Sequence, residues 1–424
     1  MKFTKKVLEN GLTLIVVPMP GNPTVTVFTG SCTGSEYEDK RTNGLSHFLE
    51  HMCFKATEKR PNAKIIAQEL DEIGANNNAY TGQEHTIYYA KSDKTHFDTI
   101  LDVVSDIYLH PTFPKTELEK ERGVILQEYK MYLDDLKWHA GDLWQELLYG
   151  DTPSGRRIVG TPETIGKLQR KDFVAYHKKQ YVAENTVVVI AGDVDESTVE
   201  KKVKEKFADI NTGKFKKKAV LKEKQNAPMV KVFHKDSDQT HIVLGVRSFG
   251  SNDKRVKIMR VMRAVLSGGM SSRLFQKMRE ELGICYYVYA SQDSFTDHGN
   301  FSVSAGVDQK RLDVAINAIL AELRKLVLEK ITDEELKKTK EGMLGRLKLG
   351  LESSDDVGSF FLDRAISRQP LVTPKELEKE VMDVSAEDIQ NLAKELFVDK
   401  KLNLVVVGKH KNEKELKGLL TFSL

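Results

Sequence analysis

The chain has 424 residues, more than one ordinary hydrophobic core contains, so its length predicts two or more domains. Apolar residues make up 40% of the chain and charged residues 30%, a composition that excludes a mostly disordered protein. Lys and Arg number 65 against 62 Asp and Glu, so the net charge gives no support for a nucleic-acid-binding protein.

Cysteine usage and hydropathy favour a cytoplasmic protein with no membrane partner. Cys32, Cys53 and Cys285 are odd in number and far apart, so we expect a reducing compartment and no disulfide framework. The apolar run at 12–18 is too short for a secretion signal and contains Thr, so it predicts a strand. No run reaches the roughly eighteen apolar residues that a transmembrane helix needs.

Taken in chain order, the predicted elements occur in the same succession twice. Each half begins with two strands and a helical stretch, continues with further strands and long helices, and ends with a buried strand leading into a helix. A period near 200 residues is too long for a solenoid, so we interpret the chain as a duplicated α+β domain. The first half shows these features at 12–17, 24–30, 86–90, 98–148 and 186–207, and the second at 229–235, 241–248, 255–266, 285–291, 300–307, 309–350 and 402–420.

The expected division is a first domain at 1–212, a linker at 213–228 and a second domain at 229–424. The linker contains Lys216, Lys217 and Lys218, which would suit either a nucleic-acid or targeting patch or a solvated connection. No aromatic or glycine-rich pattern accompanies these lysines, which favours the solvated linker.

Segment 44–54 carries the strongest chemical signal. Its apolar residues recur at i, i+3, i+4 and i+7, which predicts a helix with one buried stripe. His47, Glu50 and His51 fall on a neighbouring stripe, and imidazoles at i and i+4 can converge on one ion. Zinc binds nitrogen and carboxylate ligands, and a catalytic zinc keeps one position for water, from which Glu50 would take a proton. A structural pair of core histidines is the competing interpretation.

A third ligand is expected from a carboxylate on an inward helix face. In segment 117–133, Glu121 and Glu128 lie two turns apart on a stripe that also carries Ile125 and Tyr132. An exposed acidic face is the alternative. Beside the histidine motif, a pair of carboxylates facing a metal is the more economical account, and it leaves open which of the two binds the ion.

With these motifs, the sequence resembles the pitrilysin-type, M16-like inverzincin zinc metallopeptidases, most of all the short two-domain bacterial members. The resemblance covers essentially the whole chain. It implies two homologous domains, each a mostly antiparallel sheet packed with helices, arranged as a clamshell. The family spacing of 76 residues between the second histidine and the third ligand implies that His47, His51 and Glu128 bind one Zn²⁺ per chain. Glu121 would then support the site without binding the ion.

The same resemblance implies residues that contact substrate. Segment 74–90 resembles an edge strand beside the zinc, where Asn78 and the Ala79 backbone hold an extended peptide by strand addition. A plain hairpin turn is the local alternative. The second domain has no second zinc motif, but Arg279 and Tyr286 resemble a pair that reaches the substrate across a closed chamber. Tyr286 would donate to the developing oxyanion, and Arg279 would hold the peptide main chain or a terminal carboxylate.

The implied function is a zinc-dependent endopeptidase that hydrolyses flexible oligopeptides inside a closed chamber. A zinc-bound water is the expected nucleophile and Glu50 the general base. Family members of this length commonly pair, so a homodimer is the expected assembly. One alternative is a processing-peptidase β-type subunit that needs a partner chain. Another is a non-catalytic core subunit, which the intact motif residues argue against.

Overall fold

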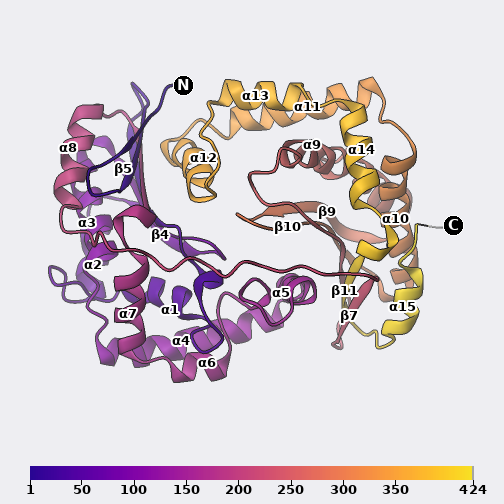
Figure 1. The fold of residues 1–424 in the computed structure, drawn as a ribbon, viewed down its shortest axis with the longest axis horizontal. Coiled ribbons are helices and arrows are strands. Elements are labelled where there is room, and N and C mark those ends of the chain that lie inside the picture. The colour runs from indigo at the N-terminus through magenta and orange to yellow at the C-terminus, as the bar shows by residue number, and fades with distance from the viewer. Residues whose placement is uncertain (423–424) are drawn as a thin grey trace. The chain divides into compact units, whose positions relative to one another are not determined.

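The computed structural model describes residues 1–422, which form two compact units, each built around one sheet (Figure 1). Each unit takes a segment from the other half of the chain. The units therefore differ from a contiguous division at 1–212, 213–228 and 229–424. Unit 1 contains Met1–Lys130, Arg156–Ala219 and Lys348–Pro374, and unit 2 contains Met131–Gly155, Val220–Leu347 and the described residues from Lys375 onward.

The sheet of unit 1 has six strands in the order β1-β2-β6-β3-β5-β4. β2 and β6 are parallel, and the other neighbouring strands are antiparallel. β6 is buried along its whole length and is apolar after its first residue, Thr186, as expected of a strand covered on both faces. β4 is an edge strand that pairs only with β5. The strands are β1 (Thr4–Val7), β2 (Thr13–Pro18), β3 (Thr24–Ser31), β4 (Asn76–Thr81), β5 (Thr86–Asp93) and β6 (Thr186–Gly192).

The sheet of unit 2 repeats this topology, because its order β7-β11-β8-β10-β9 matches β2-β6-β3-β5-β4 strand for strand. β7 and β11 are parallel, and the other neighbours are antiparallel. The predicted fold class is thus confirmed: α+β, with two homologous, mostly antiparallel sheets packed with helices. The strands are β7 (Met229–His234), β8 (Thr240–Ser248), β9 (Cys285–Ser294), β10 (Gly299–Val307) and β11 (Asn403–Gly408).

The helices also follow one order in the two repeats. Long helices follow the edge hairpin of each sheet, and an amphipathic stripe fixes their packing: α3, for example, buries Ile100, Val104 and Ile107 and lies against β3 and β5. None of the described helices combines the length and apolarity needed to cross a bilayer. The helices are α1 (Leu45–Cys53), α2 (Ala63–Asp71), α3 (Phe97–Leu109), α4 (Lys115–Asp134), α5 (Leu136–Tyr149), α6 (Pro162–Lys167), α7 (Arg170–Gln180), α8 (Glu196–Lys206), α9 (Val256–Ser267), α10 (Leu312–Leu328), α11 (Asp333–Leu349), α12 (Ser354–Ile366), α13 (Pro374–Met382), α14 (Ala386–Leu396) and α15 (Glu413–Leu419).

The exchanged helices cover one sheet face in each unit. α12 packs on β3 and β6 of unit 1, where Phe361 is fully buried in the same cluster as Phe28. Gly358 permits this close approach, because a Cβ atom there would lie 2.6 Å from the Phe28 ring. In unit 2, α5 packs on β8 and β11, and Trp144 is buried in the same cluster as Val405. Each hydrophobic core is therefore completed by a helix from the other half of the chain.

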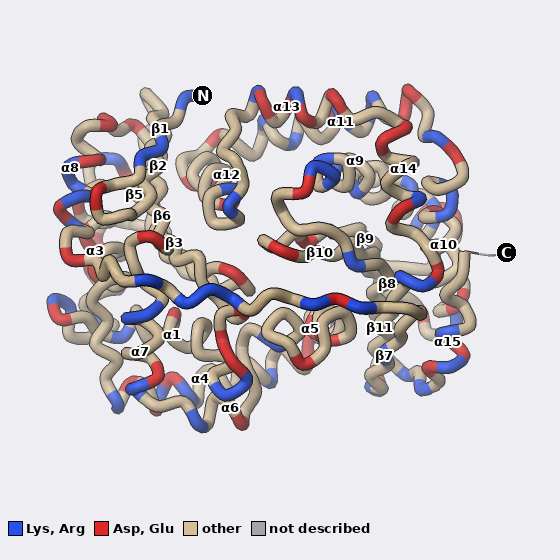
Figure 2. Tube along the Cα trace, in the orientation of Figure 1, with Lys and Arg blue, Asp and Glu red and all other residues tan. Residues whose placement is uncertain are grey.

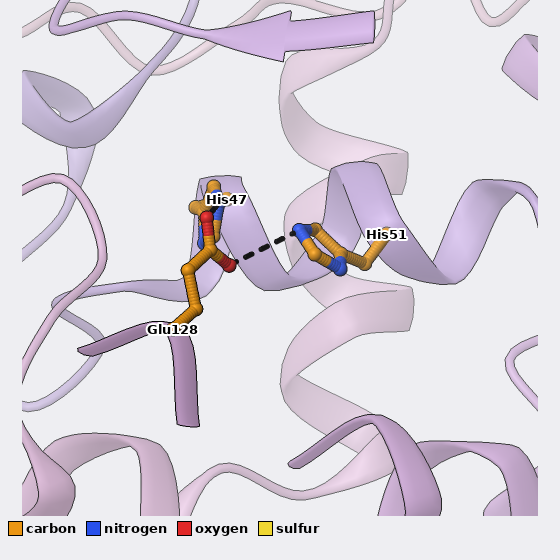
Figure 3. Close-up of side chains that lie close together, drawn as sticks. All are labelled: His47, His51 and Glu128. Carbon is orange, nitrogen blue, oxygen red and sulfur yellow. Dashed lines mark ion pairs between the residues drawn. The ribbon is translucent and has the colours of Figure 1, made fainter. Parts of the chain in front are cut away.

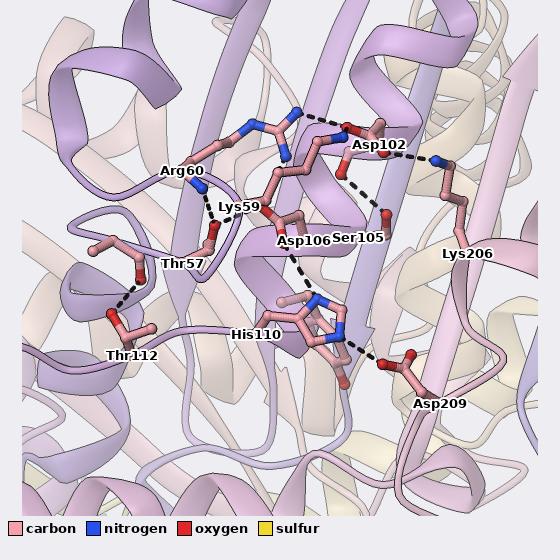
Figure 4. A network of polar contacts seen from close by, with 12 residues as sticks. Thr57, Lys59, Arg60, Asp102, Ser105, Asp106, His110, Thr112, Lys206 and Asp209 are labelled. Carbon is pink, nitrogen blue, oxygen red and sulfur yellow. Dashed lines mark hydrogen bonds and ion pairs between the residues drawn. The ribbon is translucent and has the colours of Figure 1, made fainter.

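A buried arginine ties the loop after α1 to helix α3 (Figure 4). Arg60 is only 2% exposed, and its guanidinium bonds three carboxylates, those of Glu69, Asp102 and Asp106. Its Nη2 lies 2.6 Å from Asp102 Oδ2, and its Nη1 lies 2.8 Å from Asp106 Oδ2. Lys206 of α8 also bonds Asp102, at 2.6 Å. Because a buried charge is costly without its partners, this network fixes the loop at one position.

The stability of unit 1 should depend on Asp102 in a pH-dependent way. Burial by itself would raise the pKa of Asp102, but hydrogen bonds from Arg60, Lys206 and Lys59 outweigh burial and hold the pKa well below its ordinary value. The carboxylate therefore stabilises the fold fully above its unfolded pKa of about 3.9, and this stabilisation is lost as the pH falls toward the lowered folded pKa. We expect Asp102→Asn to cost about 2 kcal/mol at pH 7 and progressively less below about pH 4.

Urea unfolding followed by circular dichroism at several pH values measures this difference. Asp98→Asn is the matched control, because Asp98 lies on the same helix and its pair with Lys202 is exposed. The control should have no measurable effect at any pH. Equal destabilisation by the two variants, or an Asp102 effect that does not change with pH, would contradict the network.

Candidate metal centre

Helix α1 presents its polar stripe because both its start and its apolar face are fixed. Its first turn is capped by the buried Glu38, whose carboxylate accepts from Gly44 N at 2.7 Å and from Ser46 N at 2.6 Å. Gly44 has φ of +94°, and a Cβ atom there would lie 2.8 Å from the carbonyl oxygen of Val159. The predicted helix with one buried stripe is confirmed by the residues Leu45, Phe48, Leu49 and Met52, all at 0–1% exposure.

The histidines of α1 and a glutamate of α4 lie around a common point (Figure 3). His47 Nε2 is 3.6 Å from Glu128 Oε1, and His51 Nε2 is 3.7 Å from Glu128 Oε2. These separations are too long for hydrogen bonds. They are near the roughly 3.3 Å between two ligands that each lie about 2 Å from one tetrahedral zinc ion. Two imidazole nitrogens and one carboxylate thus fit a catalytic zinc site with a fourth position left over.

Glu121 lies on the other side of the His51 ring. Its Oε1 is 2.8 Å from His51 Nδ1, and its Oε2 is 2.6 Å from Lys55 Nζ. Burial would raise the pKa of Glu121, but these two partners outweigh burial and lower it, so the group stays ionised. An anion at Nδ1 keeps the proton on that nitrogen and directs Nε2 toward Glu128. Of the two carboxylates on α4, Glu128 therefore faces the histidine Nε2 atoms and Glu121 faces Nδ1 of His51.

Glu50 is 8% exposed and lies on α1 between the two histidines. Thr81 Oγ1 donates a hydrogen bond of 2.6 Å to Glu50 Oε2. Burial raises the pKa of Glu50, and this outweighs the opposing effects of His47 and of the Thr81 hydrogen bond. A carboxylate with a raised pKa is better suited to accept and return a proton near neutral pH.

The edge strand β4 runs beside α1 and carries Asn78 and Ala79. Ala79 N donates to Asn78 Oδ1 at 2.8 Å, so this amide faces away from β5. Asn78 is exposed, and Thr81 closes the same strand. Unit 1 therefore places an open sheet edge next to the helix that carries the histidines and Glu50.

Arg279 and Tyr286 lie together in unit 2. Arg279 belongs to the π-helix η5 (Phe275–Glu281), and its Nη1 donates to the Tyr286 carbonyl oxygen at 2.9 Å. In the β9–β10 pairing, Gly306 faces Tyr287 and Val307 faces Cys285, so Tyr286 is the extra residue of a β-bulge. Its side chain is 73% exposed.

Some contacts in unit 1 were not anticipated from the sequence. Thr81, Lys55 and Glu38 bond functional groups through tertiary contacts, and only Thr81 had a sequence signal, because it lies three residues after Asn78. Two other residues near the motif have apolar surroundings. Cys53 is buried on the opposite side of the helix with Tyr88, and burial lowers the pKa of His85 to about 4.

Comparison with known proteins identifies the family of this chain. Residues 15–162 match the model described as Insulinase (Peptidase family M16), and residues 167–343 match the model described as Peptidase M16 inactive domain. A Bacillus subtilis protein named "Uncharacterized zinc protease YmxG" is 34% identical over 392 residues, which are 92% of this chain and 95% of that protein. The chain belongs to peptidase family M16. The family expected from the histidine motif is thus confirmed.

Other similar proteins agree with this M16 membership. A Mycobacterium leprae protein, also named an uncharacterized zinc protease, is 31% identical over 96% of this chain and 92% of its own length. The crystal structure of a protease from Helicobacter pylori has a TM-score of 0.89 at 23% identity, and covers 96% of this chain and 99% of that one. The periplasmic protease PqqL of Escherichia coli has a TM-score of 0.80 at 21% identity, over all of this chain and 49% of PqqL. At these identities the two crystal structures show the shared fold.

The hydrogen bond from Thr81 should matter for turnover by this M16 chain. Thr81→Val removes the hydroxyl at nearly constant volume and releases Glu50 Oε2, so we expect kcat for a quenched fluorescent peptide to fall about tenfold with little change in KM. Thr81→Ser keeps the hydroxyl and should restore most of kcat. Bound zinc, measured by metal analysis, should be equal in all three proteins. A Ser variant as impaired as the Val variant would show that the methyl group, not the hydrogen bond, is what matters.

Proposed function

We propose that this protein is a zinc-dependent endopeptidase that hydrolyses flexible oligopeptides. The proposal rests on one observation: His47, His51 and Glu128 surround a common point, and the carboxylate of Glu50 lies beside them. The names of the relatives, which call them zinc proteases, support the same metal, and we propose one Zn²⁺ per chain.

The residues of unit 1 divide the chemistry among them. Bound zinc would polarise the scissile carbonyl group and acidify a water molecule. Glu50 takes a proton from the attacking water and returns it to the nitrogen of the leaving amine. Thr81 holds Oε2 of Glu50, which leaves Oε1 to receive the proton. Glu121 keeps the His51 ring oriented throughout.

The open edge of β4 supports a peptide substrate in extended form. A substrate strand would pair with the outward backbone groups of β4, such as the Ala79 amide, with Asn78 next to it. Main-chain pairing is indifferent to side chains, so it predicts broad sequence specificity. It also requires an unfolded stretch of polypeptide, which favours flexible oligopeptides over folded proteins.

Unit 2 would contribute Tyr286 and Arg279 when the two units close on the substrate as a clamshell. The exposed phenol of Tyr286, carried on a bulge, is free to donate to the oxyanion that develops on the carbonyl oxygen. Arg279 would hold the peptide main chain or a terminal carboxylate. The family resemblance and the pairing of these two residues within unit 2 support this assignment.

Replacement of the base tests the proposal directly. Glu50→Gln should reduce kcat by about 10³-fold or more, because the amide cannot accept the water proton. It should leave stoichiometric zinc bound, because Glu50 is not a ligand. Peptide cleavage with and without a chelator, together with metal analysis, measures both effects. Turnover that persists in Glu50→Gln would refute the assignment, and absence of zinc from the wild-type chain would indicate a non-catalytic relative.

Replacement of the phenol tests the contribution of unit 2. Tyr286→Phe should lower kcat by about 10²-fold, because it removes one donor to the oxyanion, and it should change KM little. Tyr289→Phe on the same strand is the matched control and should be neutral. If the two variants cleave the quenched peptide equally fast, Tyr286 has no part in the reaction.

The same assays separate the remaining alternatives. Cleavage by the purified chain alone excludes a processing-peptidase β-type subunit that needs a partner. The homodimer and the cytoplasmic location stay predictions, and light scattering on the purified chain tests the first of them.

A further inference from the structure

The repeat in unit 2 has counterparts for the metal-binding elements of unit 1. α4 and α11 occupy the same place, because each is the second long helix after the edge hairpin. Counted from the first residue of each helix, Glu128 and Arg346 are both the fourteenth residue. Glu121 and Thr339 are both the seventh, and both are buried, which supports this register.

The histidine helix also has a counterpart. α1 follows β3, and α9 follows the matched strand β8. Arg260 and Ala264 of α9 take the places of the two histidines, and Arg263 takes the place of Glu50. The register comes from one shared burial pattern at i, i+1, i+4 and i+5, made by Phe48, Leu49, Met52 and Cys53 in α1 and by Val261, Met262, Val265 and Leu266 in α9.

A cavity lies between α9 and α11, next to residues that these two alignments match to the site of unit 1. Its volume is about 180 Å³, which is enough for several water molecules or one phosphate group. Ala264, Thr339 and Arg346 all line it, and these are the counterparts of His51, Glu121 and Glu128. Two independently derived registers thus point to a single cavity. Its other walls include Gly268, Gly269, Ser271, Ser272 and Lys338.

The charge around this cavity is positive. Arg346 and Lys338 line it, and its one lining carboxylate, Glu335, is bonded by Arg273 at 2.6 and 2.7 Å. Burial lowers the pKa of Arg263, and the nearby guanidinium of Arg346 lowers it further. Across residues 1–422, neither Arg263 nor Arg346 pairs with a carboxylate. Figure 2 shows how Lys and Arg recur along α9. Arg346 lines the cavity and is exposed, and Arg263 lies half-buried beside it, so an anion bonded to Arg346 would reduce the repulsion between the two guanidinium groups.

We propose that this cavity of unit 2 binds a phosphate group or an equivalent tetrahedral oxyanion. The positions that carry histidines and glutamates in unit 1 carry Arg260, Arg263 and Arg346 at three places in unit 2, so the sign of the expected ion reverses. The guanidinium of Arg346, the ammonium of Lys338 and the hydroxyls of Thr339 and Ser271 offer more donors than a carboxylate has oxygens. A tetrahedral oxyanion, with its additional oxygens, can use all of them.

Calorimetric titration of the full zinc-loaded chain with inorganic phosphate, against sodium chloride of equal ionic strength, tests this site. Arg346→Gln should weaken phosphate binding about tenfold or more, because Arg346 lines the cavity. Arg263→Gln, beside Arg346 but outside the lining, should weaken it less. Lys337→Gln is the matched control, because Lys337 lies on the same helix, is 74% exposed and does not line the cavity. The control should bind phosphate as the wild-type chain does, and circular dichroism should show all variants folded.

Three outcomes overturn the proposal. In the first, the wild-type chain fails to bind phosphate at about 10 mM. In the second, Arg346→Gln binds phosphate as tightly as the control does. In the third, acetate binds as tightly as phosphate. Phosphate bound at the metal of unit 1 would be unaffected by the arginine variants, so it cannot imitate the expected result. Because the readout is phosphate affinity, it does not depend on whether the chain hydrolyses peptides.

Discussion

The structure of unit 1 must hold two imidazole nitrogens and a carboxylate together although no hydrogen bond joins them. The distances of 3.6 and 3.7 Å from the histidine Nε2 atoms to Glu128 give little attraction by themselves. These side chains are instead held in place by contacts outside the point that they surround. Glu121 bonds the far side of the His51 ring, and Glu38 caps the first turn of α1. The fully buried apolar face of α1 then fixes the rotation of the helix.

The surrounding fold keeps these supports in position. The Arg60 network attaches the loop after α1 to α3, and α3 in turn packs on the sheet that contains β4's partner strand β5. Helix α12, which comes from the second half of the chain, covers β3 and β6 of the same sheet. Thr81 then joins β4 to Glu50. The strand whose edge we propose to pair with a peptide is therefore bonded directly to the proposed base.

The two units show how one topology supports opposite electrostatics. Strand order and helix order are the same in both, yet the positions that carry His51 and Glu128 in unit 1 carry Ala264 and Arg346 in unit 2. The apolar residues that fix the helices are retained, because they determine packing in both units. The polar residues on the neighbouring stripe are free to differ, because they contribute to a site rather than to the core.

Local pattern in the sequence was enough to determine the buried stripe of α1, the convergence of His47 and His51, the duplication and the valine-rich strand β6, because each depends on residues close together in the chain. The family spacing added Glu128. Only the tertiary structure brought Thr81, Lys55 and Glu38 to their partners, because these contacts join residues on different elements or across a loop. It also decided the exchange of α5 and α12. The sequence of an amphipathic helix shows only that one face is apolar. It does not show which of two similar sheets that face will cover.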